Sequence, residues 1–195
     1  MRHRPPPRLA IAILAAGQSR RFGAADKLTA PFRGKALGLH VADALARQPA
    51  LQRWVIVRTA DHPCQSGWRA AGFEPVVNPD AAQGQGTSLR CAAQLADQAG
   101  ADALMVCLAD MPLVPPAHFA ALVAAWQHHA EIVASHDGAL ISPPAIFARP
   151  FFGTLAAASG DHGARHLLTG AHLVASPAGA LTDIDDPLTL QRLSA

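Results

Sequence analysis

The feature that most constrains the fold of this chain is a repeated alternation of short apolar runs with segments of helical periodicity. Apolar runs of strand length occupy residues 9–15, 54–57 and 103–108. Between and after them, apolar side chains recur at spacings of three and four residues, which is typical of helices with one buried face. Strands that alternate with helices form a mainly parallel sheet covered on both faces, so we expect a three-layer α/β fold. Ligands of such sheets bind at the carboxyl ends of the strands.

The other expected elements follow the same order along the chain. A helix capped by Thr87 or Ser88 should end at Gly100, because glycine is a common helix terminator. The pair Pro115-Pro116 is typical of a helix start. Further strands are expected near 75–77, 132–134, 145–147 and 173–175, and further helices near 39–46, 66–71, 151–158 and 164–168, with a last helix opening at Pro187.

The composition indicates one compact domain. Half of the 195 residues are apolar and only 15% are charged, which excludes a disordered polyelectrolyte. The basic, proline-rich residues 1–8 are expected to form a flexible tail, and residues 9–195 a single domain. The formal net charge of +2 is too small for a nucleic-acid-binding protein, and no run approaches the roughly 20 apolar residues of a membrane span. Neither nucleic acid nor a membrane is an expected partner.

The cysteines favour a reducing compartment. Cys64, Cys91 and Cys107 show no Cys-x-x-Cys spacing, so neither a disulfide framework nor a zinc site is indicated. The apolar run 9–16 follows basic residues, as in a signal peptide, but it has only eight residues and leads into a polar and basic turn. We therefore expect a cytoplasmic protein.

A turn rich in small and basic residues follows the first apolar run. Residues 14–23 read Leu-Ala-Ala-Gly-Gln-Ser-Arg-Arg-Phe-Gly, and Asp26 and Lys27 come next. Small residues let backbone N–H groups approach phosphate oxygens, while Arg20 or Arg21 and an exposed Lys27 can neutralise a triphosphate. The glycines alone could form a simple strand-to-helix turn, but the neighbouring cations favour an NTP site. Neither a Gly-x-Gly-x-x-Gly motif nor a Walker motif is present.

This string resembles the signature of the MobA-like NTP transferases. Its Leu-Ala-Ala-Gly start is similar to that of the molybdenum cofactor cytidylyltransferases, whereas the guanylyltransferases more often carry Leu-Ala-Gly-Gly. The resemblance implies a Rossmann-like nucleotidyltransferase fold, and it spans nearly the whole chain beyond the tail. Its further motifs, in the expected order, are Gly84-Gln85-Gly86-Thr87-Ser88-Leu89, Leu108-Ala109-Asp110-Met111-Pro112, Ser159-Gly160-Asp161-His162-Gly163-Ala164-Arg165 and Asp183-Ile184-Asp185-Asp186-Pro187.

The resemblance implies a reaction in which an acceptor phosphate attacks the α-phosphorus of an NTP and expels pyrophosphate. The implied substrates are CTP and molybdenum cofactor (molybdopterin), and the implied cofactor is Mg²⁺, held by Asp110 and Asp185. Lys27 and Arg20 or Arg21 would stabilise charge on the transferred group, so the implied catalytic residues are Lys27, Arg20 and Asp110. The implied nucleotide-binding residues are Leu14, Ala15, Ala16, Gly17, Arg21, Gly23, Lys27, Gly84, Gly86 and Ser88.

Some of these residues have a structural alternative. Asp110 could be a turn residue at the end of its strand. Any of Asp183, Asp185 and Asp186 could instead cap the helix that opens at Pro187. The sequence leaves the choice among the three aspartates open.

The acceptor also has alternatives. Ser142-Pro143-Pro144 stands where the family commonly has Gly-His-Pro or Gly-Asn-Pro, in a loop near the acceptor. A guanylyltransferase for the same cofactor, or a nucleotidyltransferase for another small phosphate, therefore remains open. A protein of another class, a non-catalytic carrier that delivers the cofactor to a recipient molybdoenzyme, could retain the same fold. The presence of Lys27, Asp110 and Asp185 argues against a carrier.

Overall fold

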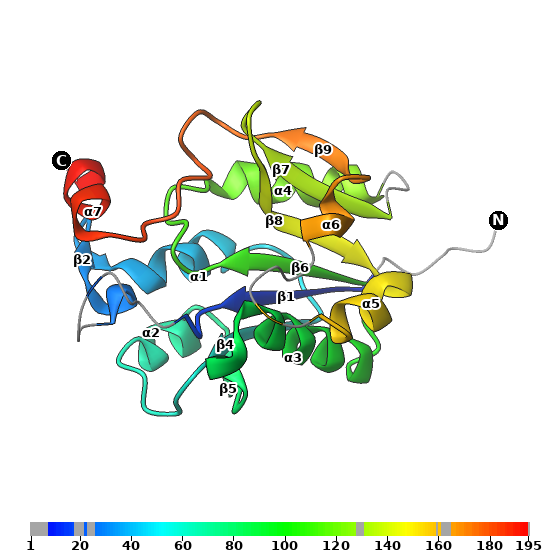
Figure 1. Ribbon diagram of the computed structural model, residues 1–195, viewed down its shortest axis with the longest axis horizontal. Helices are drawn as coiled ribbons and strands as arrows, with labels where there is room; N and C mark the ends of the chain where they lie inside the picture. Colours follow the sequence, from blue (N-terminus) through cyan, green and yellow to red (C-terminus); the bar gives the residue numbers. More distant parts are fainter. Residues whose placement is uncertain are drawn as a thin grey trace.

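The centre of the molecule is a seven-stranded sheet with the order β5-β4-β1-β6-β8-β7-β9 (Figure 1). The structure, a computed structural model, describes residues 8–17, 22, 26–127, 131–158, 160 and 165–194. The strands of this sheet are β1 (Leu9–Leu14), β4 (Gln52–Val57), β5 (Glu74–Val77), β6 (Ala103–Leu108), β7 (Ile132–His136), β8 (Ile141–Ala148) and β9 (His172–Ala175). β8 pairs antiparallel with β6 and β7, and the other pairings are parallel. The predicted mostly parallel α/β sheet is confirmed.

Helices cover both faces of this sheet. All six residues of β1 are buried, as expected for a strand between two helical layers. Its Ile11 and Ile13 pack in one core cluster, together with side chains of α1, α2 and α4, and its Ala10 and Ala12 pack in another, with α3, α5 and α6. In Figure 1, α1 and α4 lie on one side of β1, and α3 and α5 on the other. The helices are α1 (His40–Leu45), α2 (Gln65–Ala70), α3 (Gln85–Gln98), α4 (Pro116–Gln127), α5 (Phe152–Ala156), α6 (Arg165–Leu168) and α7 (Pro187–Ser194).

A small hairpin beside the sheet holds the C-terminal helix. Its two strands pair antiparallel, and its Phe32 packs with Leu37 and Ile184 in a separate buried cluster. Leu190 and Leu193 of α7 pack against that cluster, which brings the C-terminal segment beside the residues that follow β1. The hairpin was not predicted, because strands of two residues carry no recognisable apolar alternation. The hairpin strands are β2 (Pro31–Phe32) and β3 (Lys35–Ala36), and the short 3-10 helices are η2 (Lys27–Thr29), η3 (Leu37–Leu39), η4 (Ala81–Gln83) and η5 (Arg149–Phe151).

Two local predictions are wrong. α3 begins at Gln85, directly after Gly84, whose φ of 112° favours glycine, so the cap does not lie at Thr87 or Ser88. The residues 142–144 belong to strand β8 rather than to a loop. Their prolines fit there because the register of β8 with β6 begins only at Ala145, so no ladder hydrogen bond to β6 is lost. No helix in the described part of the chain is long and apolar enough to cross a membrane.

Gly100 follows the end of α3 with a φ of 70°, a conformation in which a side chain is strained. We predict that Gly100→Ala lowers the free energy of unfolding by about 1 kcal/mol. Urea unfolding followed by circular dichroism measures this loss. Gly153→Ala is the matched control, because Gly153 lies inside α5 and an added Cβ would meet nothing within 4 Å. Equal losses in the two variants would contradict the prediction.

Candidate functional site

Lys27 lies at the centre of the site. It is the first residue of η2, and its Nζ donates hydrogen bonds to Asp110 Oδ2 at 2.7 Å and to Asp185 Oδ1 at 2.5 Å. Asp110 follows β6, and Asp185 precedes α7. Because β1 and β6 are adjacent parallel strands, their carboxyl ends meet at one edge of the sheet. The structure thus brings together three residues that were singled out from the sequence.

The burial of Lys27 corrects one expectation. Only 8% of this residue is exposed, whereas the sequence analysis expected an exposed side chain. Burial by itself would lower the pKa of Lys27, but the charges and hydrogen bonds of Asp110 and Asp185 outweigh it and hold the pKa above its usual value. Lys27 is therefore a buried ammonium group that offsets part of the negative charge of two carboxylates. Its removal would leave both carboxylates without this positive partner.

One carboxylate oxygen at this point lacks a partner within the described residues. Asp110 Oδ2 accepts from Lys27, but the buried Asp110 Oδ1 has no hydrogen bond. A third carboxylate is influenced by these two: burial and then the charges of Asp185 and Asp110 raise the pKa of Asp183. An unsatisfied carboxylate oxygen beside other carboxylates fits a divalent cation, since Mg²⁺ prefers carboxylate oxygens. Within the described ranges, no group of three or more His, Cys, Asp and Glu side chains is arranged to hold a metal ion.

The neighbouring aspartates have different roles. Asp186 Oδ1 accepts from the Thr189 backbone N–H at 2.9 Å and Asp186 Oδ2 from the Thr189 hydroxyl at 2.8 Å, so Asp186 caps α7. Asp185 instead contacts Lys27. The Ile184 N–H donates to the Asp110 carbonyl oxygen at 2.9 Å, which attaches the C-terminal segment to the end of β6. The capping alternative therefore applies to Asp186.

Asn78 holds the predicted nucleotide-binding loop around Gly84 and Gly86 through hydrogen bonds to the start of α3. Asn78 is buried, and its Nδ2 donates to Thr87 Oγ1 at 2.9 Å and to Ser88 Oγ at 3.0 Å. The Gly86 N–H donates to the Gly160 carbonyl oxygen at 2.8 Å. The loop around Gly84 and Gly86 is thus fixed at the carboxyl-end edge of the sheet, where β5 also ends. The role of Asn78 was not predicted from the sequence, because its partners follow it by nine and ten positions.

Asp26 fixes the start of the turn that carries Lys27. Asp26 Oδ1 accepts from the Leu28 N–H at 2.9 Å, and Asp26 Oδ2 lies 3.1 Å from His62 Nε2. Burial acts to raise the pKa of Asp26, but the hydrogen bonds from His62 and Leu28 and the charge of Arg58 lower it below its usual value. The role of His62 was missed, because nothing in the sequence links it to a residue 36 positions away.

The other predicted nucleotide-binding residues are only partly described. Ala15 and Ala16 are buried directly after Leu14, at the carboxyl end of β1. Gly17 is exposed, and an added Cβ there would meet nothing within 4 Å. The structure therefore leaves open space at Gly17. The residues that fall outside the described part of the chain, and whose roles stay predictions, are Arg20, Arg21 and Gly23.

A buried polar network holds β8 near the site. His118 Nε2 lies 2.8 Å from Ser135 Oγ, which donates to the Pro144 carbonyl oxygen at 2.7 Å. Burial lowers the pKa of His118, so its neutral form is favoured. Because β8 runs antiparallel to β6, Ser142 and Pro143 lie toward the end of β6 that precedes Asp110. The residues that depart from the family pattern thus lie toward the edge that carries the site.

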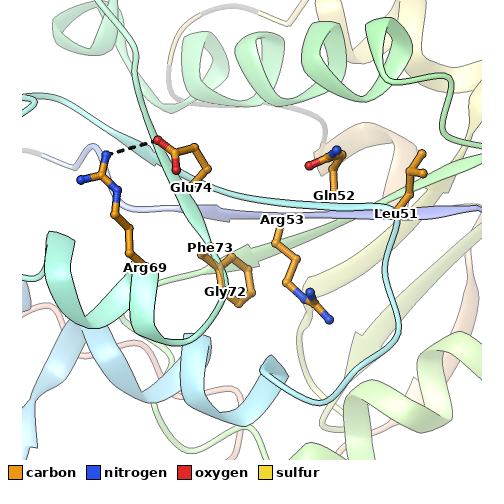
Figure 2. Close-up of a pocket in the computed structure, with 7 residues that line it drawn as sticks. All are labelled: Leu51, Gln52, Arg53, Arg69, Gly72, Phe73 and Glu74. Atoms are coloured by element: carbon orange, nitrogen blue, oxygen red, sulfur yellow. Dashed lines mark hydrogen bonds and ion pairs between the residues drawn. The ribbon is translucent and has the colours of Figure 1, made fainter.

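A cleft elsewhere on the molecule is distinct from this site. It has a volume of about 320 Å³ and lies at the amino ends of β4 and β5, the opposite edge of the sheet from Lys27. Figure 2 shows Arg69 paired with Glu74, at 3.2 Å, while the Arg53 side chain points away from both. None of the predicted site residues lines it. The lining residues are Leu51, Gln52, Arg53, Arg69, Gly72, Phe73 and Glu74.

Comparison with known proteins shows the family of the chain. The family model of the MobA-like NTP transferase domain matches residues 11–176. The chain belongs to the MobA-like NTP transferase family. The match includes Lys27 and Asp110, whereas Asp185 lies after its last residue. The chain is thus a member of a family of nucleotidyltransferases.

Two of the similar proteins, PucB and Rv0371c, match nearly the whole of this MobA-like chain, and a third matches about a third of it. Purine catabolism protein PucB of Bacillus subtilis is 34% identical over 201 residues, which are 93% of this chain and 93% of that protein. A probable molybdenum cofactor guanylyltransferase of Pyrococcus horikoshii is 39% identical over 71 residues, 36% of this chain and 35% of that protein. The crystal structure of Rv0371c from Mycobacterium tuberculosis has a TM-score of 0.81 at 26% identity, covering 96% of this chain and 97% of that one. Rv0371c also has a structure in complex with manganese, with a TM-score of 0.73 at 25% identity, covering 96% of this chain and 98% of that one.

The lowered pKa of Asp26 predicts a pH-dependent contribution to stability. A carboxylate whose folded pKa lies below its unfolded value of 3.8 stabilises the fold above that value, and the contribution is lost as the pH falls through the folded pKa. Asp26→Asn should therefore be less stable than the wild type near pH 7, and the difference should shrink below about pH 4. Urea unfolding across this pH range measures it, with the exposed Asp61→Asn as control. A difference that is constant from pH 7 to pH 3 would contradict the assignment.

Proposed function

We propose that this chain transfers CMP from CTP to a phosphate of molybdenum cofactor (molybdopterin), with release of pyrophosphate. The observation that carries the transfer reaction is the buried Lys27 ammonium, which bridges Asp110 and Asp185 at the carboxyl edge of the sheet. One cation held by two carboxylates can exchange its partners for the phosphates of a nucleotide. The family of the chain supports nucleotidyl transfer.

The role of Lys27 follows from charge. In the structure, its ammonium compensates Asp110 and Asp185. When a triphosphate enters, Lys27 turns to the phosphate oxygens and stabilises the charge that develops as the pyrophosphate leaves. Arg20 or Arg21 would add a second positive charge from the same turn. The acceptor phosphate attacks the α-phosphorus, the bond from this phosphorus to the bridging oxygen of pyrophosphate breaks, and no covalent enzyme intermediate forms.

Asp110 and Asp185 would hold Mg²⁺ once Lys27 has turned to the phosphates. The buried Oδ1 of Asp110, which lacks a partner among the described residues, supports this assignment, as does the manganese complex of Rv0371c. Bound Mg²⁺ supplies Lewis-acid stabilisation of the phosphate oxygens. The protein's own contribution is to hold the two carboxylates from separate chain segments at one point.

The choice of CTP is supported by the Leu-Ala-Ala-Gly sequence. We propose that the base lies beside the end of β1, where the small side chains of Ala15 and Ala16 permit a close approach, and Ser88 offers a hydroxyl on the loop held by Asn78. A guanylyltransferase is the second candidate, favoured by the similarity to the Pyrococcus horikoshii protein. The same relative supports molybdenum cofactor as the acceptor. A molybdoenzyme as recipient and a cytoplasmic location remain expectations from the sequence.

The proposed substrates predict a clear order among nucleotides. With purified molybdopterin and Mg²⁺, we expect kcat/KM for CTP to exceed that for GTP by at least about tenfold. A screen of all four NTPs that records pyrophosphate and the dinucleotide product measures the ratio. Product formed preferentially with GTP would establish the guanylyl candidate instead, and the absence of pyrophosphate with every NTP would favour a carrier.

The separate roles of the aspartates predict separate effects of their substitution. Asp110→Asn and Asp185→Asn should each lower turnover by about two orders of magnitude, because an amide is a poorer Mg²⁺ ligand than a carboxylate. Mg²⁺-titrated turnover measures both. Asp186→Asn is the matched control, since Asp186 caps α7 and an asparagine is also a good cap. Its turnover should stay within about twofold of the wild type. Equal losses in all three variants would contradict this division.

A further inference from the structure

We propose that His62 is a positioning residue for Lys27 and acts on it through Asp26. This inference rests on the proposed function, because it assigns His62 a part in the reaction that Lys27 supports. His62 is buried, with 8% of its surface exposed, and it lies in the segment between β4 and α2. It therefore comes from a chain segment separate from the turn that carries Lys27.

The structure fixes which nitrogen of His62 carries the proton. The Cys64 backbone N–H donates to His62 Nδ1 at 3.1 Å, so Nδ1 is an acceptor. Nε2 therefore carries the hydrogen, and it donates to Asp26 Oδ2 at 3.1 Å. Both ring nitrogens are thus used, and the ring has one orientation in which both bonds form.

Asp26 transmits this contact to the backbone of η2. Its second carboxylate oxygen accepts from the Leu28 N–H at 2.9 Å. Its carbonyl oxygen accepts from the Thr29 N–H at 3.0 Å and from the Thr29 hydroxyl at 2.7 Å. The backbone of Lys27 lies between these anchored residues. The Asp26 carboxylate contacts His62 through one oxygen and the backbone of η2 through the other. It therefore fixes the position of the backbone from which the Lys27 side chain extends.

The ring of His62 packs against a second aromatic ring. The fully buried Trp68 lies against it, with 4.6 Å between ring centroids and 31° between ring planes. Trp68 Nε1 donates to the Gly38 carbonyl oxygen at 2.8 Å. A Cβ added at Gly38 would come within 3.0 Å of Leu28 Cβ, so η3 approaches η2 closely. His62, Trp68 and η3 form a rigid support for η2, and a shift of about 1 Å in a positioning group can lower a rate by about 10²-fold.

Two substitutions separate the hydrogen bond from the packing. His62→Phe keeps an aromatic ring against Trp68 and removes the donor to Asp26. We expect kcat to fall by about 10- to 100-fold with KM for the NTP changed less than about threefold, because Lys27 acts on charge that develops in the transition state. His62→Gln retains an N–H that can reach Asp26, and it should keep kcat within about threefold of the wild type.

The deciding experiment is a double-mutant cycle with Lys27→Ala, measured as nucleotidyl transfer at saturating NTP. If His62 acts through Lys27, adding His62→Phe to Lys27→Ala should change the residual rate by less than about twofold. A further loss equal to that in the wild-type background would show a purely structural role and would overturn the inference, as would a fully active His62→Phe. If His62→Phe does not fold, Asp26→Asn replaces it in the cycle, and the same two outcomes decide the inference. Asp26→Asn is suitable because its amide oxygen can still accept from the Leu28 N–H, whereas its NH₂ group cannot accept from His62.

The same cycle distinguishes this inference from the proposed function. A wild-type protein that transfers no nucleotide, or a Lys27→Ala variant with the wild-type rate, refutes the proposed function. An active wild type with an impaired Lys27→Ala variant upholds the proposed function, and the additivity of the His62 substitution alone then decides whether His62 positions Lys27.

Discussion

The interaction on which the site depends is the bridge from the Lys27 ammonium to the carboxylates of Asp110 and Asp185, at 2.7 and 2.5 Å. Each of the three residues comes from a different part of the fold: the turn after β1, the end of β6 and the segment before α7. A buried charge is tolerated only when its partners are held in place. The parallel pairing of β1 with β6 provides two of these positions. The packing of α7 on Phe32 of the hairpin and Leu37 of η3 provides the third.

This bridge also explains why the site suits nucleotidyl transfer. A cation between carboxylates can turn to a triphosphate when a divalent metal takes over the compensation of Asp110 and Asp185. The two carboxylates then have a cationic partner both before and after the substrate enters, first the Lys27 ammonium and then the metal ion. The loop held by Asn78 and the turn held by His62 and Asp26 lie at the same edge of the sheet. The supports for the proposed base and phosphate positions therefore lie at the carboxyl ends of neighbouring strands.

The sequence predicted the sheet because the signals of its strands are local, and the resemblance to the family singled out Lys27, Asp110 and Asp185. The strand at 103–108 was predicted with its observed bounds, since a continuous apolar run ends sharply at Asp110. The supports were not predictable, because they join residues without a shared pattern: His62 reaches Asp26 over 36 positions, and β2 and β3 are too short to show alternation. The burial of Lys27 was missed for the same reason, as its two partners lie 83 and 158 positions away. The choice between Asp185 and Asp186 also required the three-dimensional contact.

The central claim is that Lys27 occupies the place between the carboxylates that a metal ion takes during the reaction. The most direct measurement is the affinity for Mn²⁺ without nucleotide, followed by electron paramagnetic resonance, in the wild type and in Lys27→Met. Since Lys27→Met removes a positive charge next to Asp110 and Asp185, the account predicts Mn²⁺ binding tighter by about tenfold or more, together with a large loss of nucleotidyl transfer. Unchanged Mn²⁺ affinity, or tighter binding with full turnover, would contradict it.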